Sequence, residues 1–240
     1  MKKLKFIPLL LSAGASVLVA CAAWSQVPMV PDSLQQKVQA LQEASAENEQ
    51  RLHTYQWIET TTVTVNGHQQ APRQSVCRYL PDGTLLKTPV GAQSQPPTLK
   101  GGPLMRHMEE KKIEEAQESV TEVRNLVARY LPPRPEALQR AFQTNRIGFE
   151  HDAGGGNSVV IHDFAKYGDT LSLDLNVAAM GLGGIRVRSY FESASDVLTA
   201  DVQFAVLPDG THYPSVTTIN AAGKGISITT VQSNFSKPVQ

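Results

Sequence analysis

The last hundred residues carry the pattern that most constrains the fold, an alternation of apolar and polar side chains at every second position. Its clearest stretch covers residues 198–206, where Leu198, Ala200, Val202, Phe204 and Val206 alternate with Thr199, Asp201 and Gln203. Successive side chains of a strand point to opposite faces of the sheet, so this period predicts a strand with one buried and one wet face. Such strands, joined by short turns, are typical of an antiparallel sheet.

The same alternation recurs in two blocks of the chain. The first block predicts a meander of three strands over residues 55–65, 73–80 and 84–90, with turns at Asn66-Gly67 and Pro81-Asp82-Gly83. The second block predicts about seven strands, over residues 147–151, 159–164, 170–177, 185–192, 198–206, 211–219 and 226–235. Two glycine runs, Gly154-Gly155-Gly156 and Gly181-Leu182-Gly183-Gly184, are expected to be tight turns, because neither opens a helix as a phosphate-binding loop does.

Three segments instead follow the helical period of three and four residues. A first helix opens at the capping sequence Pro31-Asp32-Ser33 and runs toward Tyr55. A long amphipathic helix covers residues 104–131, has a glutamate-rich polar face and is stopped by Pro132-Pro133. A short third helix starts at Pro135.

Helices and strands are therefore segregated along the chain, which predicts the α+β class. A sheet of about ten antiparallel strands tends to curl, because each strand twists. We therefore expect a strongly curved antiparallel sheet whose concave apolar face is covered by two or three helices. The sequence leaves open whether the helices fill that face as a plain core or fill it in part and leave a pocket for an apolar ligand.

The first 25 residues predict an export signal. Lys2, Lys3 and Lys5 precede an uncharged run over residues 6–20, and this run is too short for a typical membrane span. Two processing routes fit. Leu18-Val19-Ala20-Cys21 resembles a bacterial lipobox, in which Cys21 would be lipidated and tether the chain to a membrane, whereas Ala20-Cys21-Ala22 and Ala23-Trp24-Ser25 fit ordinary cleavage. Residues 26–240 are expected to form a single domain.

Charge and motifs argue against several functions. The signal holds three lysines and no acid, so removing it from a chain of 22 basic and 22 acidic residues leaves a net charge of −3. A mildly acidic domain lacks the basic footprint of a nucleic-acid-binding protein. His151-Asp152 and His162-Asp163 have no third ligand at a suitable spacing, so we expect neither a metal nor another cofactor. With no nucleophile-elbow serine, and with Cys77 expected to be a small strand residue, we expect no enzyme.

The layout resembles the bacterial lipoprotein-sorting proteins of the LolA-like superfamily, in particular its outlying envelope members. The resemblance rests on the signal, an N-terminal helix, the opening strand Tyr55-Gln56-Trp57-Ile58-Glu59-Thr60, a Glu/Lys-rich helix and a terminal run of strands. The closing string Gln232-Ser233-Asn234-Phe235-Ser236-Lys237 is similar to the Tyr-Ser-Asn/Asp-Tyr/Phe-x-Lys string of these proteins, with Gln in place of Tyr. The mid-sheet strand that carries a tryptophan in the family reads Ile185-Arg186-Val187-Arg188-Ser189-Tyr190 here.

The resemblance implies an unclosed β-barrel that is lidded by helices, holds acyl chains and has no enzymatic activity. The implied partner is a lipid or a lipoprotein acyl chain, and we expect Trp57, Val63 and Phe204 to contact it. The implied location is the periplasm, or a membrane surface if Cys21 is lipidated. A structural or protein-binding envelope module with a filled core, whose partner is another envelope protein, remains the alternative.

Overall fold

The computed structural model describes residues 44, 46–91, 103–144, 146–151, 157–176 and 181–238. The export signal with Cys21, the start of the first predicted helix and the Gly154-Gly155-Gly156 run lie outside the described residues.

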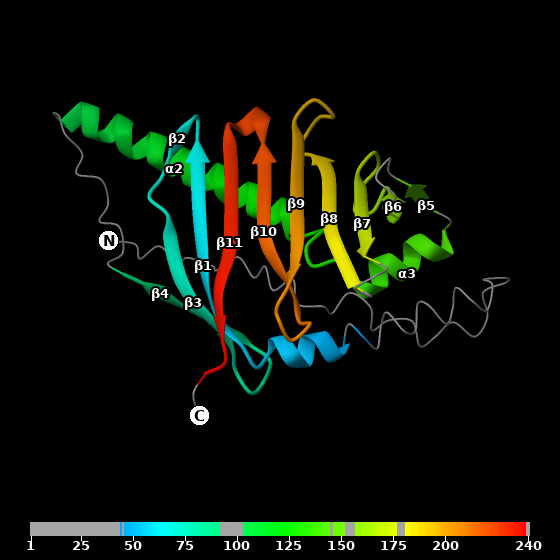
Figure 1. The fold of residues 1–240 in the computed structure, drawn as a ribbon. Coiled ribbons are helices and arrows are strands. Elements are labelled where there is room, and N and C mark those ends of the chain that lie inside the picture. Colours follow the sequence, from blue (N-terminus) through cyan, green and yellow to red (C-terminus); the bar gives the residue numbers. More distant parts are fainter. Residues whose placement is uncertain are drawn as a thin grey trace.

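Eleven strands form one antiparallel sheet (Figure 1), in which the order β4-β3-β1-β11-β10-β9-β8-β7-β6-β5 leaves the two ends unpaired with each other. The strands are β1 (Gln56–Val65), β2 (His68–Gln69), β3 (Arg73–Tyr79), β4 (Leu85–Val90), β5 (Ile147–His151), β6 (Asn157–His162), β7 (Thr170–Asn176), β8 (Gly181–Tyr190), β9 (Val197–Val206), β10 (His212–Ala221) and β11 (Ile226–Ser236). The short β2 pairs with β1 off this path. The predicted unclosed antiparallel sheet is confirmed.

Pairing of β1 with β11 joins the first meander to the end of the chain. β1 is rich in threonine and valine, whose branched side chains favour the pleated surface of a sheet. The turn after it has Asn66 at φ 49° and Gly67 at φ 78°, the left-handed backbone that an Asn-Gly hairpin turn requires. The predicted hairpin at this point is confirmed.

The expectation of a tight turn at Gly181-Leu182-Gly183-Gly184 is wrong, because these residues form the start of β8. Their neighbours explain why glycine stands here. A Cβ on Gly184 would lie 2.9 Å from the Asp174 carboxylate and 3.3 Å from the Val202 carbonyl oxygen, and one on Gly181 would lie 2.9 Å from the His212 ring. The glycines thus let the adjacent strands and their side chains approach closely.

The described helices are residues 46–52, α2 (Pro103–Val127), α3 (Pro135–Gln143) and the 3₁₀ turn η2 (Ala222–Lys224). Figure 1 shows α2 running across one face of the sheet, with its N-terminal end projecting past the β1 and β2 side. α2 ends four residues before the predicted Leu131, and a turn follows. The predicted segregation of helices from strands is confirmed.

The core lies between α2, α3 and one face of the sheet, which we call the inner face. Buried residues of α2 and of the turn after it, among them Val123, Val127 and Tyr130, belong to one cluster with strand residues that point the same way. Leu138 and Ala141 bring α3 into the same cluster. The opposite, outer face is rich in threonine, serine and charged side chains, so one face of the sheet is buried and the other wet.

Candidate ligand-binding site

The inner face divides into three tiers along β1, which differ in chemistry. The first, the apolar tier, is a row of residues in register on five neighbouring strands: Val63, Ile228, Ile219, Ala200 and Val187. All five are buried in the cluster that contains the last turns of α2. This tier offers the kind of surface on which an apolar ligand binds.

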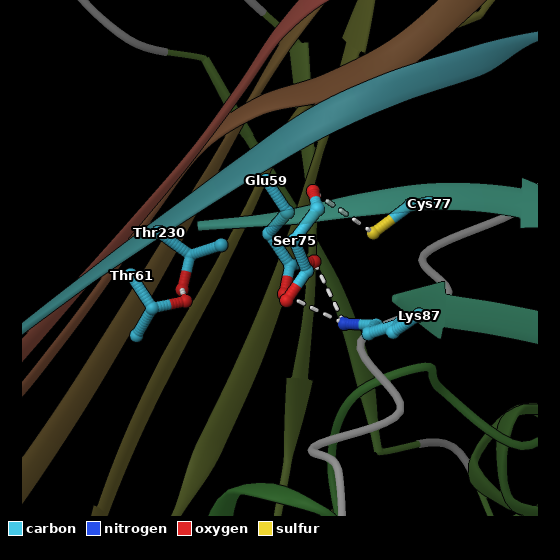
Figure 2. Close-up of polar contacts among 6 residues, drawn as sticks. All are labelled: Glu59, Thr61, Ser75, Cys77, Lys87 and Thr230. Carbon is cyan, nitrogen blue, oxygen red and sulfur yellow. Dashed lines mark hydrogen bonds and ion pairs between the residues drawn. The ribbon is translucent and has the colours of Figure 1, made fainter. Parts of the chain in front are cut away.

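The second tier starts two residues nearer the beginning of β1 and is polar. Thr61 lies opposite Thr230, with 3.3 Å between the two hydroxyl oxygens, and Thr230 lies opposite Thr217. Glu59 follows on β1 and lies between Gln232 of β11 and Ser75 of β3. We call Glu59, Thr61, Ser75, Cys77, Lys87, Thr217, Thr230 and Gln232 the polar tier; Figure 2 shows six of them.

A buried ion pair occupies this tier (Figure 2). The Lys87 ammonium donates to both carboxylate oxygens of Glu59, at 2.7 Å each. Only 11% of each side chain is exposed. Because taking both charges out of water is costly, the short charge-assisted contacts offset a desolvation penalty and the pair adds little net stability.

Cys77 lies beside this ion pair and is fully buried. Burial, reinforced by the negative charge of Glu59, raises the pKa of its thiol to about 12. The thiol is therefore protonated at neutral pH, and a protonated thiol is a poor nucleophile. The structure thus agrees with the expectation that Cys77 is a small strand residue.

The third tier, at the start of β1, is aromatic. Trp57 stacks on Phe235 with 5.5 Å between ring centroids and a 12° interplanar angle, and it contacts Tyr79 with 5.6 Å between centroids. The helix at 46–52 adjoins this end of the sheet, because the Asn48 amide donates to the His212 carbonyl oxygen and accepts from the His212 N–H. We call Trp57, Tyr79, Tyr213 and Phe235 the aromatic tier.

Two buried side-chain N–H groups have no hydrogen-bond partner among the described residues. One is the Trp57 Nε1–H and the other is the Arg124 Nε–H, on the last turn of α2. The pKa of Arg124 is lowered, first by burial and then by the positive charge of Arg73. Arg73 is the register partner of Thr61. Buried donors are nearly always paired in folded proteins, so each orphan needs an explanation.

Of the three predicted ligand contacts, two lie in different tiers and the third lies outside the tiers, on β9. Val63 is in the apolar tier, and Phe204 of β9 is half-buried against the same cluster. Trp57 lies apart from them in the aromatic tier. The structure therefore places the three residues at separate points of the inner face: Val63 is level with Ala200 of β9, Phe204 lies four residues further along that strand opposite Pro214, and Trp57 is in the aromatic tier.

Sequence reasoning missed Glu59, Lys87 and Arg124. Glu59 had a signal, because it shares the inward phase of β1 with Trp57 and Val63, where a carboxylate is unexpected. Arg124 had a weaker one, since it stands four residues after Val120 and one after Val123, beside the apolar stripe of its helix. The partner of Glu59 could not be identified from the sequence, because two hairpin connections separate β1 from β4, the strand that carries Lys87.

A cleft elsewhere on the molecule does not fit an acyl chain. It is open, has a volume of about 410 Å³ and adjoins the short helix and the β9–β10 turn. Its lining is entirely polar or charged: Glu47, Gln50, Arg51, Thr54, Asp209 and Lys237. An apolar ligand needs a mostly hydrophobic lining, so we place the candidate site on the inner face.

The histidine pairs do not form a metal site in the part of the chain that the structure describes. His151 lies opposite Asn157 and His162 opposite Thr170, so the two histidines are at opposite ends of the β5–β6 pair. Across the described ranges, no three histidine, cysteine or carboxylate side chains are placed to share an ion. No described helix combines the length and apolar character that a membrane crossing requires.

No protein-family model matches the chain, and no curated protein matches it. Two crystal structures are similar. A DUF1329 family protein from Desulfovibrio piger has 10% identity and a TM-score of 0.39, and the match covers 87% of this chain and 95% of the Desulfovibrio piger chain. A LolA superfamily protein from Nitrosomonas europaea has 10% identity and a TM-score of 0.37, and the match covers 84% of this chain and 94% of the Nitrosomonas europaea chain. The second belongs to the superfamily that the sequence resembles.

Proposed function

We propose that this chain is an exported, non-enzymatic protein of the bacterial cell envelope that binds a lipid or lipoprotein acyl chain on the inner face of its sheet. The observation that carries the proposal is the joining of an apolar tier under α2 to a buried polar tier on the same strands. An amphipathic ligand needs both kinds of surface side by side. A core that serves stability alone is not expected to contain a polar tier, because buried polar groups destabilise a core unless they are fully paired.

The way α2 is held supports entry of a ligand beneath it. Of its residues whose burial is described, the buried ones are Val123, Leu126 and Val127, all near the C-terminal end. The Glu122 carboxylate, near this end, accepts from the Lys224 ammonium at 2.8 Å. Residues 107–122 are exposed or half-buried where described, so this part of the helix is the segment that would move.

Native mass spectrometry of the chain purified from its own envelope tests the proposal. We expect a mass excess that matches a lipid or fatty acid and disappears after solvent extraction. The same spectrum reports the mature N-terminus and whether Cys21 is lipidated. A ligand-free mass, together with no uptake of a fluorescent fatty acid at micromolar protein, would exclude an acyl-chain carrier.

Dense packing on the inner face favours a second candidate, a protein-binding envelope module with a filled core. Val123, Val127 and Tyr130 pack directly against the strands of the apolar tier. For such a module, lipid extraction returns nothing and cross-linking in the envelope recovers a defined protein partner. Recovery of lipid with no cross-linked partner would exclude it.

A further inference from the structure

We infer that strand β5 is an interaction surface for a second copy of this chain, which adds its own β5 in antiparallel pairing about a two-fold axis at Gly148. The inference goes beyond the proposed function and does not depend on a ligand. The residues that carry it lie at one end of the sheet (Figure 1) and read Arg146-Ile147-Gly148-Phe149-Glu150.

The first observation is that β5 has a single strand neighbour in the described part of the chain. It pairs with β6 and is the last strand in the sheet order. The His162 N–H donates to the Arg146 carbonyl oxygen at 2.9 Å, which fixes the phase of this ladder. Hydrogen-bonded pairs alternate along an antiparallel ladder, so the main-chain groups of Ile147 and Phe149 point away from β6. An edge strand offers such groups to another strand.

The opposite edge of the sheet, β4, is protected against such pairing. Pro89 has no N–H to offer, and Lys87 places a charge on the inner face. β5 contains neither a proline nor a lysine. It carries Phe149, which is in line with the buried Val159 of β6 and yet is 60% exposed. A large apolar side chain on an open edge is typical of a site of strand addition.

The second observation is that this stretch is complementary to itself. When two copies run antiparallel with Gly148 opposite Gly148, Ile147 lies opposite Phe149 of the second copy, and Arg146 lies opposite Glu150. Both of these pairs occur twice, as a two-fold axis requires. The outward main-chain groups of Ile147 and Phe149 then bond to each other, and their side chains meet on the inner face.

The charged residues meet on the outer face. Arg146 and Glu150 are both exposed in the single chain. The Arg146 guanidinium donates to two neutral groups, the Thr144 hydroxyl and the Asp163 carbonyl oxygen. Across the axis each Arg146 lies opposite a Glu150. Exposed ion pairs contribute modestly to affinity, but they fix the register, because like charges opposite one another repel.

Gly148 fits the axis of this register. A Cβ on it would lie 3.9 Å from the Val160 carbonyl oxygen and 4.0 Å from His162 Nε2, which are ordinary contacts, so these neighbours do not require glycine. At the axis the two Gly148 residues form a non-hydrogen-bonded pair, in which the Cα atoms are about 4.5 Å apart. A register centred on Phe149 would instead place Glu150 opposite Gly148 and lose both ion pairs.

Sedimentation velocity of the purified full chain tests the inference. We expect a monomer–dimer equilibrium with a dissociation constant of about 10–100 µM, because one strand pair makes a small interface. Glu150→Arg and Arg146→Glu each set like charges opposite one another and should weaken the dimer about tenfold or more. An equimolar mixture of these two variants restores both opposite-charge pairs and should form a heterodimer with the affinity of the wild type.

Two further variants complete the series. Phe149→Ser removes the apolar contact and should weaken the dimer about tenfold. The matched control is Glu192→Arg, which makes the same charge change as Glu150→Arg in the exposed loop after β8 and should leave dimerisation unchanged. Circular dichroism and melting curves check that each variant folds. Recovery of the dimer in the mixture needs two folded partners, so it distinguishes charge repulsion from misfolding.

Amide hydrogen exchange of the wild type reports on the edge residue by residue. The amides of Ile147 and Phe149 point away from β6 and should exchange more slowly as the protein concentration rises through the dissociation constant. The amides of Gly148 and Glu150 point to β6 at every concentration and are the internal control.

Three results would overturn the inference. A chain that stays monomeric up to about 500 µM has no such interface. A dimer that keeps its affinity in Glu150→Arg, Arg146→Glu and Phe149→Ser forms through another surface. Slow exchange of the Ile147 and Phe149 amides at every concentration would mean that another segment of the same chain already pairs with β5. None of these results bears on acyl-chain binding, which native mass spectrometry tests separately.

Discussion

Glu59 of β1 carries a buried charge. Both of its oxygens accept from the Lys87 ammonium at 2.7 Å, and little of either side chain reaches solvent. Removing one partner leaves a desolvated charge, whereas removing both leaves none. The two kinds of variant should therefore differ sharply in stability.

Lys87→Met is expected to lower the free energy of unfolding by about 3–5 kcal/mol, because it leaves the Glu59 carboxylate buried without a cation. The double variant Lys87→Met/Glu59→Gln should recover most of this loss. Urea denaturation of the wild type, the two single variants and the double variant measures the coupling. Equal stability of Lys87→Met and the double variant would show that Glu59 is not buried as a charge.

Cys77 gives the protein a defined sensitivity to alkaline pH. Burial and the charge of Glu59 raise the pKa of the thiol from 9.0 to about 12. Between these values the unfolded chain loses the proton and the folded chain keeps it, so the free energy of unfolding falls as pH rises. The thiol's contribution to the free energy of unfolding is fully present below pH 9. Above that pH it is lost at a rate that approaches about 1.4 kcal/mol per pH unit.

Cys77→Ala should flatten this dependence, most clearly from pH 9 to 10, below the range in which Tyr79 also contributes. The pKa of Tyr79 rises from 10.0 to about 12, chiefly through burial. Denaturant titrations at half-unit pH steps compare the slopes of wild type and variant. Identical slopes would mean that the thiol titrates alike in the folded and unfolded chains.

At the scale of elements, the C-terminal end of α2 is fixed by a buried polar network. The Tyr130 hydroxyl donates to Asp169 Oδ2 at 2.5 Å and lies 2.8 Å from the Ser189 hydroxyl. The same carboxylate oxygen accepts from the backbone N–H groups of Ala165 and Lys166. One phenol thus joins the turn after α2 to the loop before β7 and to β8.

Tyr130→Phe should lower the free energy of unfolding by about 1.5–3 kcal/mol, the range for a hydrogen bond to a charged group. Ser189→Ala removes only a contact between neutral hydroxyls and should cost less, about 0.5–1.5 kcal/mol. Thermal and urea denaturation measure both. If Tyr130→Phe is neutral, the network does not anchor α2.

The elements themselves were largely predictable, because β7, β9 and β11 alternate buried and more exposed residues, although β6 is buried on both faces. Local patterns could not show which residues distant in the sequence lie close together in the sheet. Gly181 and Gly184 look like turn residues in sequence, yet their neighbours His212, Asp174 and Val202 come from three other strands or turns. The alternation of apolar and polar residues identifies the buried face of a strand. Only the register across the sheet shows which side chains lie close to a glycine.

The candidate site was predictable in part for the same reason. The inward phase of β1 placed Val63 on the buried face, and the alternation of β9 placed Phe204 there too. The polar tier needs five strands in register, with Lys87 of β4 contacting Glu59 of β1, and Thr61 of β1 contacting Thr230 near the end of the chain. Nothing local in the sequence encodes those meetings.

For the whole molecule, the question is which part opens. Tyr130 and the Glu122–Lys224 ion pair hold the C-terminal end of α2, whereas residues 107–119 have no buried side chain where burial is described. A helix held at one end and lightly packed along the rest opens by pivoting or local unfolding at the free part. The N-terminal part of α2 is therefore the expected lid over the inner face.

Hydrogen exchange should show this difference directly. We expect amides of residues 107–119 to exchange faster than those of residues 123–127, and palmitate to change exchange most in the first group. Glu118→Gly, at an exposed position within the helix, destabilises it by about 1 kcal/mol and should raise the palmitate association rate about fivefold, because the open state becomes easier to reach. Glu192→Gly, in the exposed loop after β8, is the control and should leave the rate unchanged. An association rate that is the same in both variants and the wild type, with uniform exchange along α2, would mean that ligand enters by another route.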